Sequence, residues 1–411
     1  MKWLTSLIKD LNRKSNQNNR KYKKGIGVIR YPFIYQMDIR VVIPCYNEPD
    51  VLCVINSLFT CQSLNLNVEI IIIVNSYRIS SNNIIEINRK TFEQLEQYAS
   101  IKNTSRFHLT PILVEDLPGH QTGAGVPRKI GMDIATDNFY KENNPNGILV
   151  SLDADCTVEN NYLIEIYSSF KKYKLKSATI EFYHPVEHLS KRDKIRKATE
   201  VYEEYLRYYQ KSLEYTGYPY AYHTIGSAFA VTAKIYKQVG GMGKQQAGED
   251  FYFLQKVFPL GKTQFIQSTR VYPAARISDR VPFGTGPAIA KMIKDEDIKK
   301  LSYQFKAFDE LRLLFEMINL FFKSNEEEIK HKCKQLPKHM QLFLEEDNFL
   351  SKMKEINSHT ATTVNFKKRF FNYFNAFKIL KYLNYVHPSP YQLMDVKSQF
   401  DLLKDKFNSS S

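Results

Sequence analysis

The chain has 411 residues, of which 43% are hydrophobic and 13% aromatic, and its formal net charge is +15. This length allows about two or three domains, and the composition excludes an intrinsically disordered protein. The positive balance favours an anionic partner, which leaves phosphorylated ligands, nucleic acid and an anionic membrane surface as candidate classes.

The cysteines and the chain's apolar stretches bear on its cellular compartment. The five cysteines lack C-x-x-C spacing and predict neither a disulfide framework nor a zinc site. Because Cys45, Cys53 and Cys61 lie among apolar residues, we expect buried thiols in a reducing cytosol. The sequence shows no signal peptide and no stretch near the roughly 18 apolar residues that a membrane span needs. We therefore expect a cytoplasmic protein.

The basic segment 1–25 stands apart from the rest of the chain. From Lys2 to Lys24 it carries many lysines and arginines and a single acid, Asp10. It is expected to be either a frayed tail or an amphipathic anchor that makes peripheral contact with an anionic inner membrane.

The first half of the chain alternates apolar strands with helical patterns. Apolar runs predict strands at 39–45, 68–74, 109–114 and 148–152. Helical spacing predicts helices at 51–61, 84–100 and 128–140, with Pro127 suited to the first position of the last of these. This alternation within about 120 residues favours a mostly parallel, doubly wound α/β sheet flanked by helices.

The second half continues the pattern and then changes character. We expect strands at 177–183, 224–231 and 265–272, and helices at 160–174, 191–213, 233–239 and 250–257. Aromatic residues then recur at helical spacing over 305–322, 342–353 and 366–383. The predicted organisation is an α/β domain over 26–295, with halves 38–156 and 157–295, and an all-helical C-terminal region over 296–411.

Two carboxylates, Asp153 and Asp155, follow the strand predicted at 148–152. Alternate residues of an extended segment point to the same side, so both acids face one point beyond the strand's carboxyl end. Ligands of open α/β sheets bind at that edge. Two hard oxygen donors there suit a divalent cation that also binds phosphate oxygens. The structural alternative is an Asp pair that caps the helix beginning near Asn160.

A glycine-rich loop over 119–127 leads into the helix predicted at 128–140. Gly123 and Gly125 at a helix start allow backbone N–H groups to approach a phosphate closely. Arg128 would add a charge-assisted contact to the same anion.

Four stretches, taken together, resemble the family 2 glycosyltransferases, which have the GT-A fold and use nucleotide sugars. They are Val-Val-Ile-Pro-Cys-Tyr-Asn-Glu over 41–48, Gly-Ala-Gly-Val-Pro-Arg-Lys-Ile-Gly-Met over 123–132, Leu-Asp-Ala-Asp over 152–155 and Gly-Glu-Asp over 248–250. Gly226 and the Val-Gly-Gly-Met stretch from Val239 strengthen the resemblance, which covers about 38–290 and neither end of the chain.

The resemblance implies roles for four acids. Asp155 would ligate Mn²⁺ or Mg²⁺, and Asp153 would contact ribose or metal-bound water. Asp250 would be the general base that accepts the acceptor hydroxyl's proton, and Glu249 would position the acceptor or Asp250. The structural alternative makes Glu249 and Asp250 first-turn acids that complement a helix dipole.

The resemblance also implies a donor site. Pro44, Tyr46 and Glu48 match a nucleotide-binding turn, in which Tyr46 packs on the base and Glu48 accepts from ribose or base. Asn75 stands where the family usually has an Asp that reads the base, which puts a uridine donor in doubt. The family's additional metal-binding histidine has no match between Asp250 and Lys330.

Two arginines and several histidines lie near these motifs in the sequence. Arg276 or Arg280, in the loop 276–286, would contact phosphate if that loop is not merely structural. The scattered histidines, among them His120, His184 and His223, are expected to be structural.

The expected function is a metal-dependent, inverting transfer of a sugar, such as a hexose, from a nucleotide-diphosphate sugar to a hydroxyl of a glycan or lipid-linked acceptor in surface polysaccharide synthesis. A retaining GT-A transferase or a nucleotidyltransferase on the same scaffold is the first alternative. A basic nucleic-acid-binding protein is the second, and nucleic acid is not expected as a partner because no recognition motif accompanies the charge.

Overall fold

The structure is a computed structural model that describes residues 36–62, 65–118, 123–243, 248–277, 284–295 and 298–408. The basic N-terminal segment, His120 and Arg280 lie outside the described residues. The chain divides into two compact units. The first unit comprises 1–189 and 224–290, and the second comprises 190–223 and 291–411. In the described part of the chain, no helix is both long enough and apolar enough to span a membrane.

The first unit is built on one sheet, which has eight strands within the described residues. Its strands, in chain order, are β1 (Ile39–Cys45), β2 (Val68–Tyr77), β3 (Phe107–Leu117), β4 (Ile148–Ser151), β5 (Cys156–Val158), β6 (Ser177–Phe182), β7 (Phe229–Thr232) and β8 (Thr263–Pro273). Their spatial order is β3-β2-β1-β4-β7-β6-β8-β5. The pairs β2–β3, β1–β2, β1–β4 and β6–β8 are parallel. The pairs that β7 makes with β4 and β6 are antiparallel, as is β5–β8.

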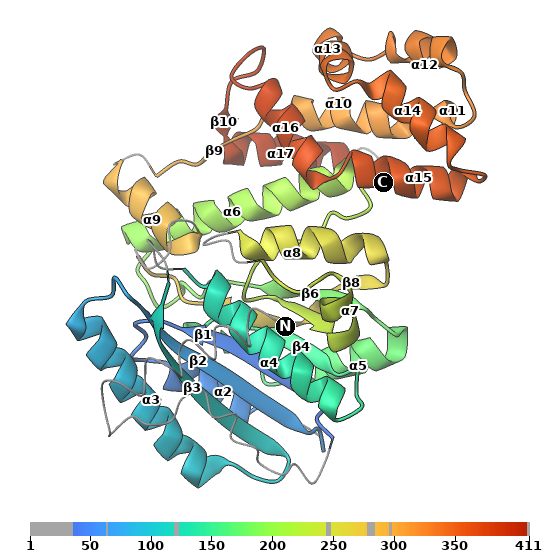
Figure 1. Ribbon diagram of the computed structural model, residues 1–411. Helices are drawn as coiled ribbons and strands as arrows, with labels where there is room; N and C mark the ends of the chain where they lie inside the picture. The colour runs from blue at the N-terminus through green and yellow to red at the C-terminus, as the bar shows by residue number, and fades with distance from the viewer. Residues whose placement is uncertain are drawn as a thin grey trace. The chain divides into compact units, whose positions relative to one another are not determined.

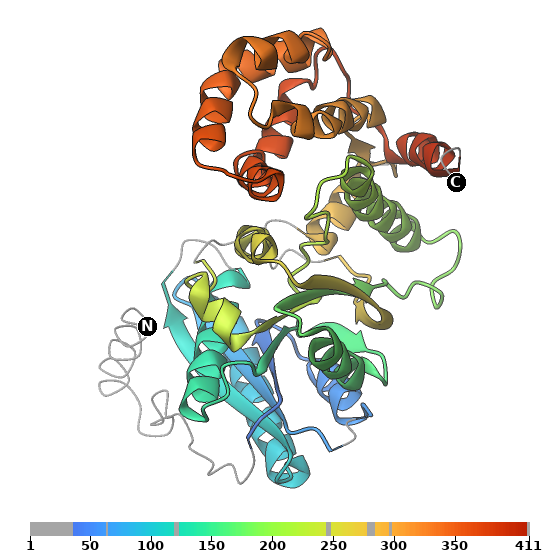
Figure 2. The same ribbon diagram turned by 90° about the vertical axis from the view of Figure 1, so that its right-hand side faces the viewer.

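Helices cover both faces of this sheet (Figures 1 and 2). They are α2 (Leu52–Phe59), α3 (Asn82–Lys102), α4 (Gly125–Lys141), α5 (Tyr162–Tyr173), α7 (Ala233–Gln238) and α8 (Glu249–Val257), followed by the short helix η1 (Phe258–Leu260). The predicted fold class, an α/β sheet flanked by helices with a helical C-terminal region, is confirmed. The antiparallel strand β7 was not foreseen in the parallel pattern.

Strand alternation decides which side chains meet which helices. In β1, β2 and β4, the residues Ile43, Ile72 and Val150 belong to a buried cluster shared with α2, α3 and α5. The residues between them point to the opposite face, where α4 packs on β1 and β2. A methyl group at Gly131 of α4 would lie 2.4 Å from Val42 Cγ1, so this glycine lets the helix approach β1 closely.

Helix α8 lies on the same face as α4. Phe253 of α8 packs against Phe229 of β7 and against Tyr236 of α7, with ring centroids 5.8 and 5.5 Å apart. Phe229 alternates with Ala228 and Ala230, which belong to the opposite buried cluster. The start of α8 is therefore held on the α4 face of the sheet by aromatic packing.

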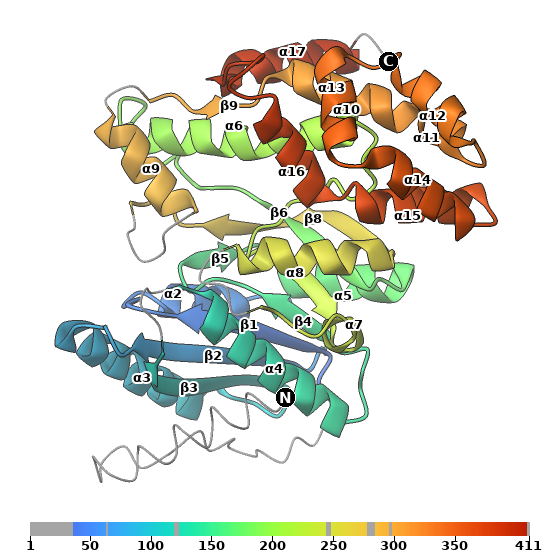
Figure 3. The ribbon, with the colours of Figure 1, turned by 45° about the horizontal axis from the view of Figure 1, so that its top comes forward.

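The second unit is largely helical (Figure 3). It contains α6 (Lys194–Tyr215), β9 (Leu301–Ser302), α10 (Phe305–Glu316), α11 (Ile318–Phe321), α12 (Glu326–Cys333), α13 (Lys338–Glu346), α14 (Phe349–Ser358), α15 (Thr363–Tyr373), α16 (Ala376–Tyr385), β10 (Met394–Asp395) and α17 (Val396–Asn408). Helix α9 (Thr285–Lys294) contains the boundary between the units. The two units differ from the sequence-based division at two places. Helix α6 packs on α10 and α17 and so groups with the C-terminal helices, and the boundary falls after residue 290 rather than 295.

Several predicted element bounds were wrong. The helix expected over 342–353 is divided into two helices at Asn348. The backbone of Asn348 has a φ of 54°, a left-handed conformation that ends an α-helix. The helix expected over 366–383 is also divided, at Asn375, whose side chain caps α16 by accepting from the amides of Phe377 and Lys378. Helix α4 begins at Gly125, so Pro127 is its third residue. The strand expected over 224–231 begins only at Phe229.

The cysteine prediction was partly wrong. Cys45 and Cys61 are buried, but Cys53 is exposed. Cys53 lies on α2, whose buried positions are Val54, Ile55 and Leu58. The helical period therefore turns Cys53 away from the sheet, which its apolar neighbours in sequence did not reveal.

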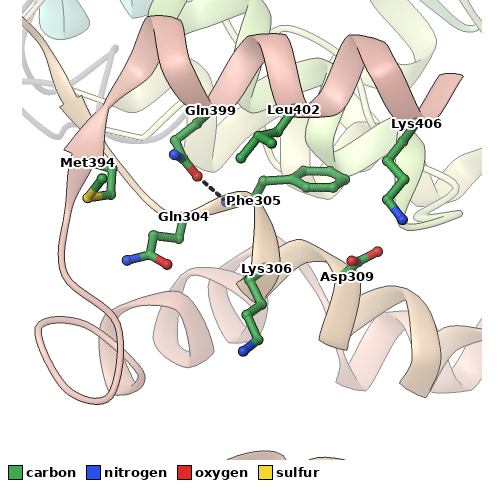
Figure 4. Close-up of a pocket in the computed structure, with 8 residues that line it drawn as sticks. All are labelled: Gln304, Phe305, Lys306, Asp309, Met394, Gln399, Leu402 and Lys406. Atoms are coloured by element: carbon green, nitrogen blue, oxygen red, sulfur yellow. Dashed lines mark hydrogen bonds between the residues drawn. The ribbon is translucent and has the colours of Figure 1, made fainter. Parts of the chain in front are cut away.

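A pocket of about 300 Å³ lies between α10 and α17 in the second unit (Figure 4). Its lining includes Phe305, whose backbone N–H donates to Gln399 Oε1 at 2.9 Å, and the two lysines Lys306 and Lys406. None of the predicted site residues lines this pocket.

Candidate functional site

The predicted acids gather around two arginines on the α4 face of the first unit. Arg128 pairs with Asp153 and Glu249, and Arg276 pairs with Asp155 and Glu48. Each guanidinium thus joins one carboxylate of the Asp-x-Asp stretch to one buried glutamate. We call these groups the Arg128 cluster and the Arg276 cluster.

The Arg128 cluster is built by the first turn of α4 and the end of β4. Arg128 Nη2 donates to Asp153 Oδ1 at 2.8 Å, and Nη1 donates to Ser151 Oγ at 3.2 Å. Ser151 and Asp153 are two residues apart, so strand alternation places both beneath α4. Asp153 therefore lies on the α4 side of the sheet, directly after β4.

The loop before β7 and the start of α8 complete this cluster. Arg128 Nη1 also donates to the carbonyl oxygen of Gly226 at 2.9 Å, and Ser151 Oγ donates to the same oxygen at 2.6 Å. Arg128 Nε lies 3.4 Å from Glu249 Oε1 in an ion pair. Gly226 is required here, because a methyl group on it would lie 2.7 Å from Arg128 Nη1.

Burial and charge act in opposite directions on Arg128. Its side chain is 3% exposed. Burial alone would lower the pKa of Arg128, but Asp153, Glu249 and Asp250 outweigh it and raise that pKa. The guanidinium therefore stays charged and holds the three acids in one place.

Glu249 and Asp250 lie in the first turn of α8, the position in which acids complement a helix dipole. Glu249 is buried, and Asp250 Oδ1 accepts from the backbone N–H of Phe251 at 2.7 Å. Burial and the neighbouring Glu249 raise the pKa of Asp250 to about 7, although Arg128 opposes the shift. A carboxyl with such a pKa can accept and return a proton near neutral pH.

The pKa of Asp153 is also raised, first by burial and then by Glu249, while Arg128 lowers it. Its side chain keeps 37% of its surface exposed, so solvent relieves part of this shift. The structural alternative for the Asp pair, capping of the following helix, is not what the structure contains. Helix α5 begins at Tyr162, and its N-cap, Asn161, makes no side-chain cap hydrogen bond.

The Arg276 cluster lies after β8. Arg276 Nη2 donates to Asp155 Oδ2 at 2.9 Å, and Nη1 donates to Glu48 Oε1 at 3.2 Å, with a second short contact between Nη2 and Glu48 Oε2. Glu48 is 1% exposed, whereas Arg276 and Asp155 are 30% and 32% exposed. Burial would lower the pKa of Arg276, but its hydrogen bonds to Glu48 and Asp155 raise it.

The predicted nucleotide-binding turn lies beside the start of α4. Tyr46 makes an edge contact with Tyr77 of β2, with ring centroids 5.8 Å apart. The Tyr77 hydroxyl donates to the carbonyl oxygen of Gly123, just before α4, and burial raises the pKa of Tyr77 to about 12. Pro44 is buried within β1, opposite Ile73 of β2.

Asn75 of β2 has an unusual environment. It is fully buried, and neither its amide nitrogen nor its amide oxygen has a hydrogen-bond partner in the structure as described. Leaving such groups unpaired costs about 1–3 kcal/mol each. Its backbone oxygen does accept, from Asn88 Nδ2 at 2.7 Å. The side chain thus holds one donor group and one acceptor at the carboxyl end of a central parallel strand.

The start of α4 presents backbone donors. The N-cap residue of α4 is Ala124, whose side chain cannot accept a hydrogen bond. It therefore caps none of the backbone N–H groups that begin at Gly125. The free N–H groups of a helix N-terminus attract anions. The phosphate contact expected at Gly123 and Gly125 stays a prediction.

The residues near Asp155 fit a cation only in part. Among the described residues, no group of three or more His, Cys, Asp and Glu is close enough to hold a metal ion. Yet Asp155 and Glu48 already share one cationic group, the Arg276 guanidinium. This donor chemistry suits a cation bound by Asp155, with Asp153 nearby, if ligand oxygens and water complete its shell.

Two of the histidines that were expected to be structural, His184 and His223, are buried. His184 is buried, and its Nε2 lies 3.3 Å from Thr285 Oγ1. His223 belongs to the second unit, where burial, helped by Arg207 and Lys211, lowers its pKa to about 4.

Sequence reasoning missed Ser151 and Tyr77, and it named Arg276 only as a phosphate contact. Ser151 had a usable signal, because it lies two residues before Asp153 on a predicted strand. Tyr77 and the Glu48 partner of Arg276 had none, since both contacts join residues far apart in sequence.

Comparisons with known proteins gave fold-level likeness only. No model of a known protein family matches the chain, and no curated protein sequence matches it. Among solved structures, S. aureus TarS residues 1–349 in complex with UDP-GlcNAc aligns at 11% identity and a TM-score of 0.42, covering 82% of this chain and 91% of that one. The same protein in complex with UDP aligns at 12% identity and a TM-score of 0.39, with the same coverage. Likeness at this level assigns neither a ligand nor an activity to this chain.

Proposed function

We propose that the chain is a metal-dependent glycosyltransferase that moves a sugar, such as a hexose, from a nucleotide-diphosphate sugar to an acceptor hydroxyl with inversion. One observation carries this proposal. Arg128 contacts Asp153 at the end of β4 and Glu249 at the start of α8, and so holds a donor-side acid beside the candidate base Asp250.

The donor half of the proposal rests on the edge of the parallel strands. Asp155, with Asp153, would hold Mn²⁺ or Mg²⁺, which when bound stabilises negative charge on the leaving diphosphate. Backbone N–H groups at Gly123 and Gly125 would receive phosphate oxygens. Arg128 would position Asp153 rather than contact phosphate, because its guanidinium is already held by protein acceptors.

The nucleoside would lie near Tyr46 and Asn75. Tyr46 offers a ring face or edge to a base, and Pro44 forms the wall of β1 beneath it. Asn75 offers a donor and an acceptor that have no partner among the described residues. Glu48 would contact ribose only if Arg276 moved, because Arg276 now occupies its carboxylate.

The acceptor half of the proposal rests on Asp250. A single displacement at the anomeric carbon needs a base that removes the acceptor hydroxyl's proton as its oxygen attacks. The raised pKa of Asp250 suits it to that task, and Glu249 would orient it through Arg128. This observation favours inversion over retention.

The acceptor is proposed to be a glycan or a lipid-linked hydroxyl used in surface polysaccharide synthesis at the cytoplasmic side of the inner membrane. The positive charge of the chain supports an anionic surface or ligand as its partner. Peripheral membrane contact through residues 1–25 is part of the same proposal.

The test is a thermal-shift series with nucleoside diphosphates and nucleotide sugars of each base, with and without Mn²⁺. A ligand that binds the folded protein raises its melting temperature by mass action, and we expect a shift of several degrees that requires Mn²⁺. Asp155→Ala should lose this shift. Glu86→Ala, which removes an acid from the exposed face of α3, should keep it.

The result that contradicts the proposal is the absence of any nucleotide-dependent shift in the wild-type protein. The stereochemistry of the product separates the alternatives. Product with the donor's anomeric configuration indicates a retaining transferase, and product that carries the nucleotide indicates a nucleotidyltransferase.

A further inference from the structure

Asp155 is held by a cation that belongs to the protein itself. Its Oδ2 accepts from Arg276 Nη2 at 2.9 Å, and the same guanidinium is held by Glu48. Arg276 therefore occupies Oδ2, one of the two carboxylate oxygens that Asp155 could offer to a metal ion. Arg276 follows the end of β8 by three residues.

Like charges make the two occupants of Asp155 incompatible. A divalent ion bound to Asp155 would lie within a few ångströms of a permanently charged guanidinium, and that repulsion is strong at a partly buried position. A metal bound without displacing Arg276 would therefore bind weakly. Conversely, removing the guanidinium takes a positive charge away from Asp155 and Glu48, which favours the binding of a cation there.

Exposure distinguishes Arg276 from the other arginine of the site. Arg128 is 3% exposed and donates to protein oxygens from both terminal nitrogens, so it has no direction in which to move. Arg276 is 30% exposed, and within the described residues its guanidinium donates only to the carboxylates of Glu48 and Asp155. An anionic diphosphate can replace these carboxylates as a bidentate partner for a guanidinium.

We propose that Arg276 is an internal counter-cation that competes with the metal for Asp155. The diphosphate of a nucleotide draws Arg276 away, so the metal and the nucleotide bind together and the metal alone binds poorly. This inference rests on the proposed function, because it assumes that Asp155 is the metal ligand. It adds that Arg276 couples metal binding to donor binding.

The experiment measures Mn²⁺ affinity of the full chain without any nucleotide, by the loss of the free-ion electron paramagnetic resonance signal on titration. We expect weak binding by the wild type and at least tenfold tighter binding by Arg276→Gln. Arg276→Lys keeps the charge and should change the affinity less than threefold. Arg270→Gln, which removes an exposed arginine from β8, is the matched control and should match the wild type.

A second variant protects the test against misfolding. Arg276→Gln removes the guanidinium that pairs with the buried Glu48, so the double variant Glu48→Gln with Arg276→Gln removes both charges together. It should also bind Mn²⁺ more tightly than Glu48→Gln alone, and its melting temperature reports whether it folds.

The outcomes separate this inference from the proposed function. If the wild type and both Arg276→Gln variants bind Mn²⁺ equally, and Asp155→Asn abolishes that binding, the competition is refuted and the metal site stands. If Mn²⁺ binding is absent from every variant, or is unaffected by Asp155→Asn, both the competition and the metal part of the proposed function fail.

Discussion

The Arg128 cluster and the Arg276 cluster use the same chemistry with different burial. Each joins an acid of the Asp-x-Asp stretch to a glutamate that is 6% exposed or less. Arg128 is enclosed by α4, β4 and the loop before β7, whereas Arg276 follows the end of β8 and is ten times more exposed, at 30% against 3%. The comparison suggests that the first cluster holds the site's shape and the second exchanges its partners.

The largest expected effect is on transfer, in the Asp250→Asn variant beside the Arg128 cluster. A positioned general base contributes about 10²–10⁴-fold to a rate, and we expect a loss in that range. Metal-dependent nucleotide binding should persist, since Asp250 is not proposed to touch the donor phosphates. Turnover and thermal shift measured on the same preparation check both points, and wild-type activity would refute the assignment of the base.

The next effect is on stability, in Arg128→Met. Removing one partner of a buried ion pair leaves uncompensated carboxylates and costs about 3–5 kcal/mol of the free energy of unfolding. Arg276→Met should cost less, about 1–2 kcal/mol after allowance for solvent screening. Denaturant titration of both variants measures the difference, and equal losses would remove the distinction between the clusters.

A smaller loss of stability is expected from Gly226→Ala. Its added methyl group would lie 2.7 Å from Arg128 Nη1, and this overpacking costs about 1–3 kcal/mol. The double variant with Arg128→Met is the control, because the clash disappears when the guanidinium is removed. The two losses should therefore be less than additive, whereas strict additivity would mean that the clash is not with Arg128.

The smallest expected effect is the change of transfer rate and stability with pH that the titration of Asp250 causes. The pKa of Asp250 is raised to about 7, so the ionised base is lost below that pH and transfer should fall about tenfold for each further pH unit. Stability changes in the opposite direction. Because the folded-state pKa lies above the ordinary value of 3.8, the contribution of Asp250 is present below pH 4 and is lost as pH rises toward 7.

Asp250→Asn is the control for this pH dependence. In this variant, the part of the change in melting temperature between pH 4 and pH 7 that comes from Asp250 should disappear. A wild-type rate profile with no inflection near pH 7 would contradict the role of Asp250, even if the stability profile behaves as expected.

Local patterns in the sequence determined the strands, most helices and the place of the acids. The apolar run that ends at Leu152 was enough to predict that Asp153 and Asp155 lie at a ligand-facing sheet edge, because strand alternation is a local property. The same holds for Glu249 and Asp250 as first-turn acids of α8. The sequence predicts single helices over 342–353 and 366–383 where the structure has two pairs, because Asn348 and Asn375 interrupt the backbone without interrupting the apolar period.

Only the tertiary structure decided which charges meet. The sequence by itself placed Arg128, Asp153 and Glu249 on three separate elements, and the packing of α4 and α8 on one sheet face brought them within 3.4 Å. The tertiary structure also brings Arg276 into contact with Asp155 and Glu48, which are 121 and 228 residues away in the sequence. Such contacts depend on the close approach of α4 at Gly131, on the antiparallel β7 and on aromatic packing of α8, none of which leaves a period in the sequence.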